Sequence, residues 1–427
     1  MSGRAFGGRK FDGHLPAPEF ANIETTRYCN LRCRMCIPYL GGKTVKGPHM
    51  SDAMFDRVAS SVFPFVKRWQ PTVSGEPTMS KHFARMLDIA GEYGVKIEMV
   101  TNATLLNDRM IDALAPGLGS VTFSFDSHDA ETYEEIREGA DFERVVGKIR
   151  QLMRRAKEKL PESERPVFGF NCTLMEPNIR HLAALVTFAS EEIGVDFVTT
   201  HHVFPVTDEV KARSLVHYRE LAQREIDRAI READRTGITL IVNALDLMTA
   251  TTALGKSERD LPTRDGVVEG LEARHANVDK LRKAPLPDLD APDNARVSER
   301  RNEAARDARF PRPYRRTRLG KWARLLTRRA PRRGSRIGYC EFLWTKTYIQ
   351  LDGKVSTCCV HKAPVVGSLE DAPLDEVWNN ETYRTMRKQI VLQDPVPACR
   401  GCMHIREITD PGLIDLALQG KEIPDPS

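Results

Sequence analysis

The feature that most constrains this 427-residue chain is a group of three cysteines near its start. Cys29, Cys33 and Cys36 follow the spacing C-x3-C-x2-C. Three thiolates can ligate three irons of a cubane [4Fe-4S] cluster and leave the fourth iron open to a substrate or cosubstrate. Zinc is the alternative, but a structural zinc ion normally takes four protein ligands, and the nearest further candidate is His49. The spacing therefore favours an iron-sulfur cluster with one open iron.

At these cysteines the sequence resembles the radical S-adenosylmethionine (SAM) superfamily. The resemblance implies that the open iron chelates the amino and carboxylate groups of SAM, and that one electron cleaves SAM to a 5′-deoxyadenosyl radical. The chain departs from the usual family pattern at Met35, where an aromatic residue commonly contacts the adenine. A thioether is polarizable and can also cover the face of a ring.

A second motif follows the expected second strand. Ser74, Gly75, Glu76 and Pro77 resemble the family's Gly-Gly-Glu-Pro motif, with serine in place of the first glycine. The resemblance implies that the backbone and the acid of this motif hold the amino group of SAM. An ordinary turn without a ligand is the alternative.

Further SAM contacts are implied at the ends of later strands. By resemblance, Ser124 and Asp126 hydrogen-bond the ribose hydroxyls, and Arg137 pairs with the SAM carboxylate, for which an arginine fork is well suited. A solvent-facing salt bridge is the alternative for Arg137. Thr101 and Asn102 are polar groups after the third strand that could touch SAM or substrate, or cap the following turn.

Strand-like and helical patterns alternate along residues 20–245. The expected strands are 20–25, 71–74, 96–101, 120–125, 167–174 and 196–203, and the expected helices include 54–66, 83–93, 108–114, 142–160, 179–193 and 212–236. This alternation predicts an α/β fold with a parallel sheet covered by helices. A doubly wound sheet would suit it equally; the resemblance implies a partial (β/α)6 barrel. The chemistry of such folds sits at the carboxyl ends of the strands, where the cysteine loop begins.

We expect three parts: a radical SAM partial barrel at 1–245, an insertion at 246–336 with short helices, and an auxiliary-cluster domain at 337–427. Residues 296–336 hold sixteen Lys or Arg and three acids. This local charge could belong to a solvated linker, hold an anionic substrate, or dock an acidic electron donor such as flavodoxin or ferredoxin. Nucleic acid is not an expected partner, because no binding module is recognisable.

Four more cysteines lie near the C-terminus: Cys340, Cys358, Cys399 and Cys402. Four thiolates fully ligate a [4Fe-4S] cluster, which can then transfer electrons or brace the domain without binding SAM. A four-cysteine zinc ribbon is the alternative. The pattern resembles the twitch domain, a shortened SPASM domain, so the expected cofactors are two [4Fe-4S] clusters and SAM. A two-residue hairpin between 348–351 and 354–357 and a helix at 374–391 are expected here.

Cys359 directly follows an expected ligand. Successive strand residues point to opposite faces, so its thiol would face away from the cluster that Cys358 ligates. A free thiol near both cluster and substrate could return a hydrogen atom to a carbon radical. A cysteine that is merely buried is the alternative, and it is the interpretation we favour for Cys172.

Twitch and SPASM enzymes are mainly peptide maturases or small-molecule modifiers, and the peptide enzymes commonly carry a leader-binding domain before the barrel. Only 28 residues precede Cys29, so we expect a carbohydrate substrate, as in the sugar and aminocyclitol enzymes of antibiotic biosynthesis that the chain resembles. The expected reaction is epimerisation of a carbinol carbon with Cys359 as hydrogen donor. Oxidation to a ketone, with His201 or His202 as base, and peptide modification are the alternatives. A further alternative is a non-catalytic iron-sulfur electron carrier or scaffold.

Composition suggests where the protein works. The chain has no signal-peptide pattern and no apolar run long enough for a membrane span. Its nine cysteines fall mostly at metal-binding spacings, which indicates a reducing compartment rather than disulfides. We therefore expect a soluble, cytoplasmic protein without a membrane partner.

Overall fold

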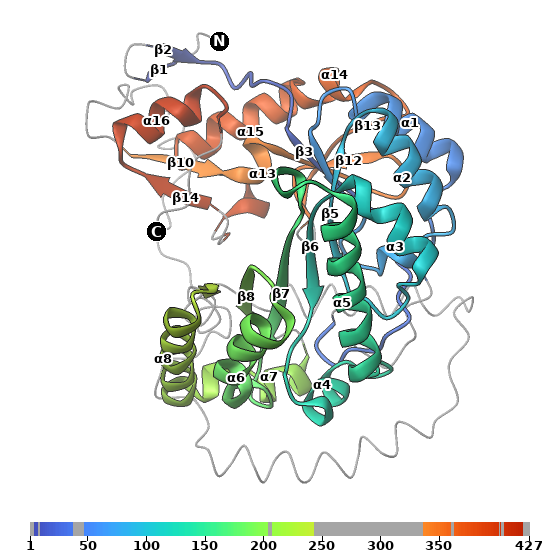
Figure 1. The fold of residues 1–427 in the computed structure, drawn as a ribbon. Helices are drawn as coiled ribbons and strands as arrows, with labels where there is room; N and C mark the ends of the chain where they lie inside the picture. Colours follow the sequence, from blue (N-terminus) through green and yellow to red (C-terminus); the bar gives the residue numbers. More distant parts are fainter. Residues whose placement is uncertain are drawn as a thin grey trace, which may run out of the picture.

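The computed structural model describes residues 4–6, 9–36, 47–203, 207–242, 336–359, 363–400, 402 and 405–421. Parallel strands form the centre of the fold (Figure 1). They are β3 (Phe20–Ile23), β4 (Arg68–Gln70), β5 (Lys96–Thr101), β6 (Leu118–Ser124), β7 (Val167–Leu174), β8 (Phe197–His202) and β9 (Thr239–Val242). Each pairs in parallel with the next.

The order of these strands decides between the two architectures that the sequence leaves open. From β3 to β9, every strand lies beside the strand that follows it in the chain. A doubly wound sheet reverses its strand order at a switch point. Crossovers of one hand that always advance in the same direction instead place their helices on one face. The α/β fold with a parallel sheet is confirmed, and its order is that of a partial barrel.

Helices cover the outer face of this sheet (Figure 1). They are α1 (Asp52–Val62), α2 (Phe83–Glu92), α3 (Asp108–Leu114), α4 (Ala130–Ile136), α5 (Phe142–Lys159), α6 (Leu182–Thr187), α7 (Asp208–Ala212) and α8 (Arg219–Thr236). Local caps mark both ends of these helices. At the start of α5, the Asp141 side chain accepts from the Arg144 N–H. At its C-terminus, α8 ends at Gly237, which has φ +75°.

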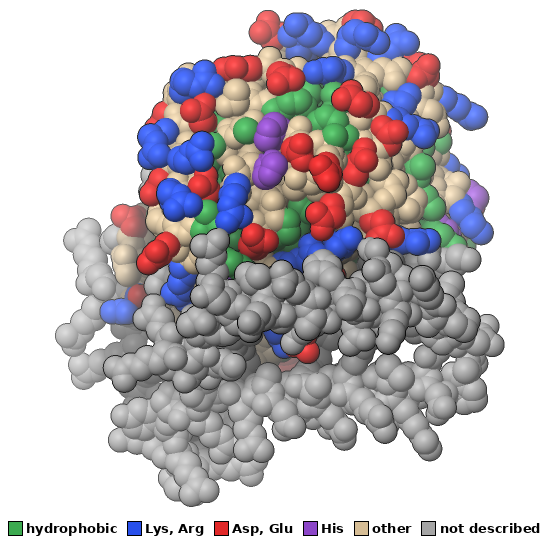
Figure 2. Space-filling model, turned by 90° about the horizontal axis from the view of Figure 1, so that it is seen from below, with side chains coloured by type: hydrophobic (Ala, Val, Ile, Leu, Met, Phe, Trp, Pro, Cys, Tyr) green, Lys and Arg blue, Asp and Glu red, His purple; other side chains and the backbone are tan. Residues whose placement is uncertain are grey.

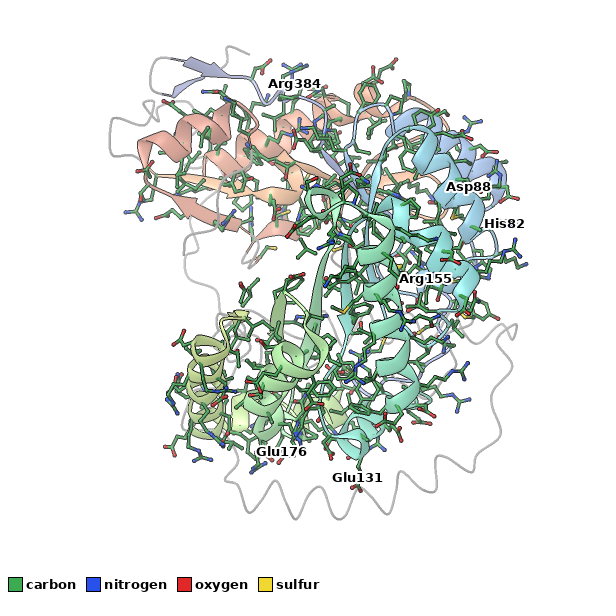
Figure 3. The ribbon with its side chains drawn as sticks, in the orientation of Figure 1. His82, Asp88, Glu131, Arg155, Glu176 and Arg384 are labelled. Atoms are coloured by element: carbon green, nitrogen blue, oxygen red, sulfur yellow. The ribbon has the colours of Figure 1, made fainter. Side chains whose placement is uncertain are left out.

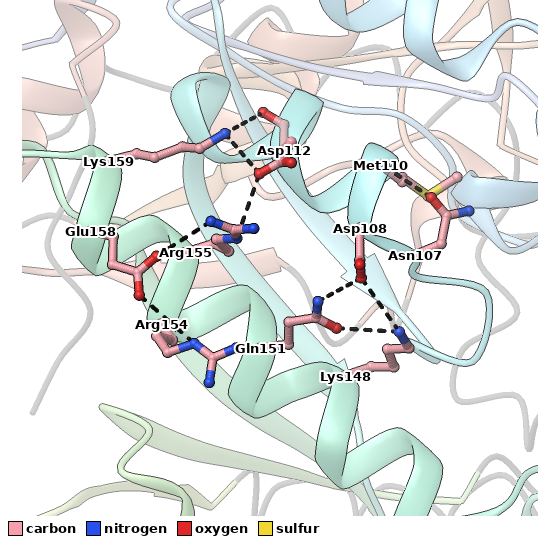
Figure 4. A network of polar contacts seen from close by, with 10 residues as sticks. All are labelled: Asn107, Asp108, Met110, Asp112, Lys148, Gln151, Arg154, Arg155, Glu158 and Lys159. Carbon is pink, nitrogen blue, oxygen red and sulfur yellow. Dashed lines mark hydrogen bonds and ion pairs between the residues drawn. The ribbon is translucent and has the colours of Figure 1, made fainter.

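Helix α5 shows how the outer layer separates its two faces. Its buried residues recur at helical spacing: Phe142, Val145, Val146, Ile149, Leu152 and Ala156. On the other face, Lys159 pairs with Asp112 of α3 at 2.8 Å, and Gln151 donates to Asp108 at 2.6 Å (Figure 4). Such exposed pairs add little stability individually. The exposed face of α5 thus carries surface ion pairs and hydrogen bonds to α3.

Aromatic side chains fill the space between the sheet and the helices. Phe125 stacks on Phe170 with 4.5 Å between ring centroids and on Phe188 with 5.9 Å. Tyr133 of α4 lies 4.7 Å from the Phe125 ring. Offset and tilted ring pairs add to the energy of area burial. The loop that leaves β6 is thereby anchored in the core.

The C-terminal part joins the same sheet. Its elements are β10 (Ile337–Cys340), α13 (Glu341–Trp344), β11 (Lys346–Ile349), β12 (Lys354–Ser356), β13 (Val365–Ser368), α14 (Leu374–Trp378), α15 (Glu381–Val391), β14 (Ile405–Ile408) and α16 (Pro411–Leu418). Strand β11 pairs in parallel with β3, and β12 and β13 extend the sheet to ten strands. Strands β10 and β14 form a separate antiparallel pair.

Several local predictions differ from the structure. The second strand lies at β4, and 71–74 is the loop after it. The hairpin lies where predicted, but its loop has three residues, because the Gln350 N–H donates to the Lys354 carbonyl and Gly353 sits at φ +76°. The helix predicted at 374–391 is divided, since the Asn380 side chain caps α15 by accepting from the Tyr383 N–H.

The remaining parts need only brief description. Strands β1 (Arg4–Phe6) and β2 (Arg9–Phe11) form a small antiparallel pair. The insertion 246–336, with its predicted helices and basic charge, lies outside the described residues apart from Arg336. The described part of the face in Figure 2 mixes acidic and basic side chains. None of the helices in the described ranges combines the length and apolar character needed to cross a membrane.

Candidate functional site

The cysteine loop begins after β3, at the carboxyl edge of the sheet. Cys33 is buried, and Cys29 and Cys36 are half-buried. The Cys36 N–H donates to the Cys33 carbonyl at 3.0 Å. Burial raises the pKa of Cys29 to about 11 and that of Cys33 to about 12. Both are thus neutral thiols in the cluster-free chain, and cluster assembly must release their protons.

The loop after β4 packs against the cysteine loop through Gly75. A Cβ there would lie 2.7 Å from the carbonyl oxygens of both Thr26 and Tyr28, so only glycine allows this approach. The Glu76 N–H donates to the Tyr28 carbonyl at 2.7 Å. Pro77 then opens a 3-10 turn, where its missing N–H is no loss. The structure therefore brings this motif directly beside the cysteines.

The Glu76 carboxylate is buried and accepts hydrogen bonds from two loops. Its Oε1 accepts from the hydroxyls of Thr78 and Thr101, each at 2.7 Å, and its Oε2 accepts from the Asn102 N–H at 2.8 Å. Burial raises the pKa of Glu76, and these hydrogen bonds oppose the rise. The acid thus holds the end of β5 in place. Its contact with the amino group of SAM stays a prediction.

Asn102 connects the end of β5 to the cysteine loop. Its Nδ2 lies 3.8 Å from Cys29 Sγ and donates to Asn30 Oδ1 at 3.1 Å. Its Oδ1 accepts from the N–H and the hydroxyl of Thr104. Ala103 between them has φ +59°, a costly left-handed conformation for alanine. Hydrogen bonds to cluster sulfurs tune a cluster's potential, so this arrangement fits an iron-sulfur site.

Arg137, which follows α4, makes a second contact with a cysteine of the loop after β3. Its Nη1 lies 3.7 Å from Cys33 Sγ, and its Nε lies 2.7 Å from Asp126 Oδ2. Asp126 Oδ1 accepts from the Thr173 N–H at 2.7 Å. Burial raises the pKa of Asp126, and the adjacent guanidinium opposes this. Arg137 is only 6% exposed, so the solvent-facing salt bridge is excluded; the SAM contacts of both residues stay predictions.

The remaining barrel residues differ in their surroundings. Ser124 ends β6 and is half-buried at the carboxyl edge. Cys172 is fully buried, as the sequence predicts. The suggestion that His202 is a base is wrong, because it is buried and its Nε2 already accepts from the Leu215 N–H at 3.0 Å. His201 occupies the neighbouring position in β8.

The four C-terminal cysteines come from three separate segments. Cys340 ends β10, Cys358 follows β12, and Cys399 and Cys402 share a turn in which the Cys402 N–H donates to the Cys399 carbonyl at 3.3 Å. Cys340 and Cys399 both interact electrostatically with Cys358 and Cys402. The four sulfurs thus share one neighbourhood, although no three His, Cys, Asp or Glu side chains in the described ranges converge on a single-ion site. In a cubane cluster the ligand sulfurs bind separate irons.

Sequence reasoning misses Glu24, a buried acid directly after β3. Its Oε2 accepts from the Tyr348 hydroxyl at 2.7 Å, and its Oε1 accepts from the Thr72 hydroxyl at 2.6 Å. The N–H groups of Val73 and Ser74 donate to the same oxygen at 3.3 Å. Glu24 therefore connects β11 with the loop that carries the Gly75 motif. An acid at the end of an apolar strand is the signal that could have identified it.

Known families match two segments of the chain. The radical SAM superfamily matches residues 23–168, and the iron-sulfur cluster-binding SPASM domain matches residues 340–403. The chain contains a radical SAM domain and a SPASM domain. These domains account for the cofactors, which are SAM and [4Fe-4S] clusters that include an auxiliary cluster.

Among sequence relatives of the radical SAM domain is the tungsten-containing aldehyde ferredoxin oxidoreductase cofactor-modifying protein of Pyrococcus furiosus. It is 28% identical over 198 residues, which cover 45% of this chain and 53% of that protein. The GTP 3′,8-cyclase of Desulforamulus reducens is 29% identical over 139 residues, or 31% of this chain and 42% of the cyclase. The chain thus spans about half the length of these relatives or less.

Solved structures share the fold of the radical SAM and SPASM domains. Streptococcus suis SuiB bound to the precursor peptide SuiA has a TM-score of 0.51 at 14% identity and covers 88% of this chain and 67% of SuiB. Native anSMEcpe with bound AdoMet and the Kp18Cys peptide has a TM-score of 0.52 at 16% identity. The match covers 90% of this chain and 87% of anSMEcpe. At these identities the likeness concerns the fold.

Proposed function

We propose that this radical SAM enzyme epimerises a carbinol carbon of a carbohydrate-type small molecule. The observation that carries the proposal is Cys359, an exposed thiol directly after the auxiliary ligand Cys358. Glu24 and Lys346 are among the charged groups that act on this thiol, and Glu24 lies at the carboxyl edge of the barrel. The Cys359 thiol thus lies near enough to the carboxyl edge of the barrel for Glu24 to act on it electrostatically.

The reaction needs a hydrogen atom removed from one face of a carbon and another returned to the opposite face. SAM, held at the first cluster by Glu76 and Arg137, would on receiving one electron supply the radical chemistry that removes this hydrogen atom. The Cys359 S–H then breaks, its hydrogen atom forms the new C–H bond, and a sulfur radical remains. One electron from the reductant, such as a flavodoxin or ferredoxin, and one proton from water restore the thiol. No net oxidation of the substrate results.

Residues around the first cluster support the SAM-dependent step. Cys29, Cys33 and Cys36 provide three thiols, and Asn102 and Arg137 each place a donor nitrogen within 4 Å of a cysteine sulfur. In the proposal, Arg137 would exchange part of its pairing with Asp126 for the SAM carboxylate. Ser124 and Asp126 at the end of β6 would meet the ribose.

The test is anaerobic turnover of the reconstituted, reduced enzyme in D2O with SAM and a panel of sugars and aminocyclitols, followed by mass spectrometry. Because a thiol exchanges its proton with solvent, we expect a product one mass unit heavier, and no label in Cys359→Ala. Cys172→Ala is the matched control, since that thiol is buried away from solvent. A product two mass units lighter would instead establish dehydrogenation, and label retained in Cys359→Ala would refute the role of this thiol.

Peptide modification is the second candidate function. It is favoured by SuiB and anSMEcpe, which share the fold and were both crystallised with peptides. The same D2O assay with a peptide panel separates the two: label at a backbone carbon of a peptide, with no turnover of any sugar, would replace the carbohydrate proposal. Failure of the reduced protein to cleave SAM with every substrate would favour an electron carrier.

A further inference from the structure

Arg387 of α15 is completely buried, with 0% of its surface exposed. Its guanidinium lies 4.2 Å from the ring centroid of Trp378 and 4.8 Å from that of Tyr383. Its Nη1 donates to the Gly13 carbonyl and to Asn379 Oδ1, each at 3.0 Å. The arginine thus connects the N-terminal segment around Gly13 to the SPASM domain through hydrogen bonds.

All of these partners are neutral. Within the described residues no carboxylate forms an ion pair with Arg387, and its Nη2 is buried without a hydrogen-bond partner. Burial lowers the pKa of Arg387 to about 9 in the cluster-free chain. Buried charges in proteins are normally paired. A positive charge in this position therefore calls for a negative group that the amino acids nearby do not supply.

The cysteines of the auxiliary cluster lie on the other side of the groups that Arg387 touches. Its Nε donates to the Leu343 carbonyl at 2.8 Å, at the end of the single-turn helix α13 that begins after Cys340. The backbone N–H of Leu343 in turn acts electrostatically on the Cys340 thiol. Tyr383, beneath the guanidinium, interacts electrostatically with both Cys340 and Cys358. Two residues that Arg387 contacts directly, Leu343 and Tyr383, thus both act on cysteines that are expected to ligate the auxiliary cluster.

We propose that Arg387 is the buried counter-charge of the auxiliary cluster and raises its reduction potential. Four thiolate charges exceed the charge of the cubane core, so the loaded cluster is negative, and it becomes more negative when it accepts an electron. A fixed positive charge in a medium of low dielectric constant stabilises the reduced form more than the oxidised form. Arg387 is thus a positioning residue for electron transfer that touches neither substrate nor cluster.

The test is an EPR-monitored redox titration of the full-length protein with Cys29, Cys33 and Cys36 replaced by alanine, so that only the auxiliary cluster contributes. In this background Arg387→Met removes the charge and keeps an extended side chain. We expect the reduction equilibrium to shift about tenfold toward the oxidised cluster, which is about 59 mV for a one-electron couple.

Arg384→Met is the matched control, because Arg384 lies one turn earlier on α15 (Figure 3), is only half-buried, and pairs with Asp12 at 2.6 Å. Its potential should equal that of the parent protein. Arg387→Lys keeps the charge but loses the planar fork, so we expect a nearly normal potential and lower stability. An unchanged potential in Arg387→Met, or an equal shift in Arg384→Met, would overturn the proposal.

A second measurement distinguishes the loss of the counter-charge from a general folding defect in Arg387→Met. The thermal midpoint of each protein is compared with the cluster loaded and after iron removal. We expect the substitution to lower the midpoint more in the loaded protein, because only there is the buried charge compensated. An equal loss in both states would mean that Arg387 serves only to hold the segment at Gly13, and the counter-charge would be refuted.

Discussion

At the residue scale, the site is shaped by buried acids whose hydrogen bonds are satisfied within the protein. Glu24 and Glu76 are 1% and 2% exposed, and each accepts four hydrogen bonds from neighbouring strands and loops. Leaving one buried donor unsatisfied costs about 1–3 kcal/mol. The two acids therefore hold the loops around the cysteines in one arrangement before any ligand binds.

Gly75→Ala tests how closely these loops must approach. Its Cβ would meet two carbonyl oxygens at 2.7 Å, so we expect a loss of about 1–3 kcal/mol in the free energy of unfolding and weaker SAM binding. Urea unfolding and equilibrium dialysis with SAM measure the two effects. Gly91→Ala in α2 is the control, because nothing lies within 4 Å of its Cβ; equal behaviour of the two variants would contradict the close contact.

The sequence predicts the residues whose motifs are local and misses those that act over a distance. The spacing of Cys29, Cys33 and Cys36 lies within one loop and is visible in the chain. The hydrogen bond between Glu24 and Tyr348 joins residues 324 positions apart, and no periodicity reports it. Arg387 is similarly hidden, since an arginine in a polar helix normally faces solvent.

At the element scale, strands with a long apolar pattern are predicted well. The bounds of β5 and β7 agree with the sequence prediction. Strand β4 is missed because it has three residues, of which only Trp69 is fully buried. The start of α8 is also missed, because a separate short turn, Leu215–His217, precedes it and keeps a helical composition. Short elements are selected by packing, which local sequence does not encode.

His202 connects the end of β8 to the turn before α8, because its Nε2 accepts from the Leu215 N–H. The burial of this side chain makes the stability of the protein depend on pH. Burial lowers the pKa of His202 from 6.5 to about 4. The unfolded chain then binds more protons than the native state between these values, so stability is lost as pH falls from 6.5 to 4, by about 3 kcal/mol. Urea unfolding across this range should show that His202→Asn loses less free energy of unfolding on acidification than the parent protein does. His14→Asn, at an exposed position, is the control; identical pH profiles for His202→Asn and the parent protein would refute this role.

At the scale of the whole molecule, the radical SAM and SPASM domains share one sheet. Strand β11 pairs with β3, and the N-terminal segment crosses to the other domain, where Trp378 Nε1 donates to the Pro16 carbonyl at 2.6 Å and Asn379 bonds to Leu15. Without β11, β3 would present an unpaired edge of the kind that promotes aggregation. The two domains are therefore expected to unfold together rather than in sequence.

Tyr348→Phe tests this coupling, because it removes the hydroxyl that joins β11 to Glu24 and leaves a buried acceptor short of one partner. We expect a loss of about 1–3 kcal/mol, shared equally by peptides from β3 and β11 in native-state hydrogen exchange, since both become exposed only in global unfolding. Tyr93→Phe removes an exposed hydroxyl and should change neither. If β11, β12 and β13 lost protection while β3 to β9 kept theirs, the SPASM domain would open by itself, and electron transfer between the two cluster sites would depend on a docking equilibrium rather than on a fixed sheet.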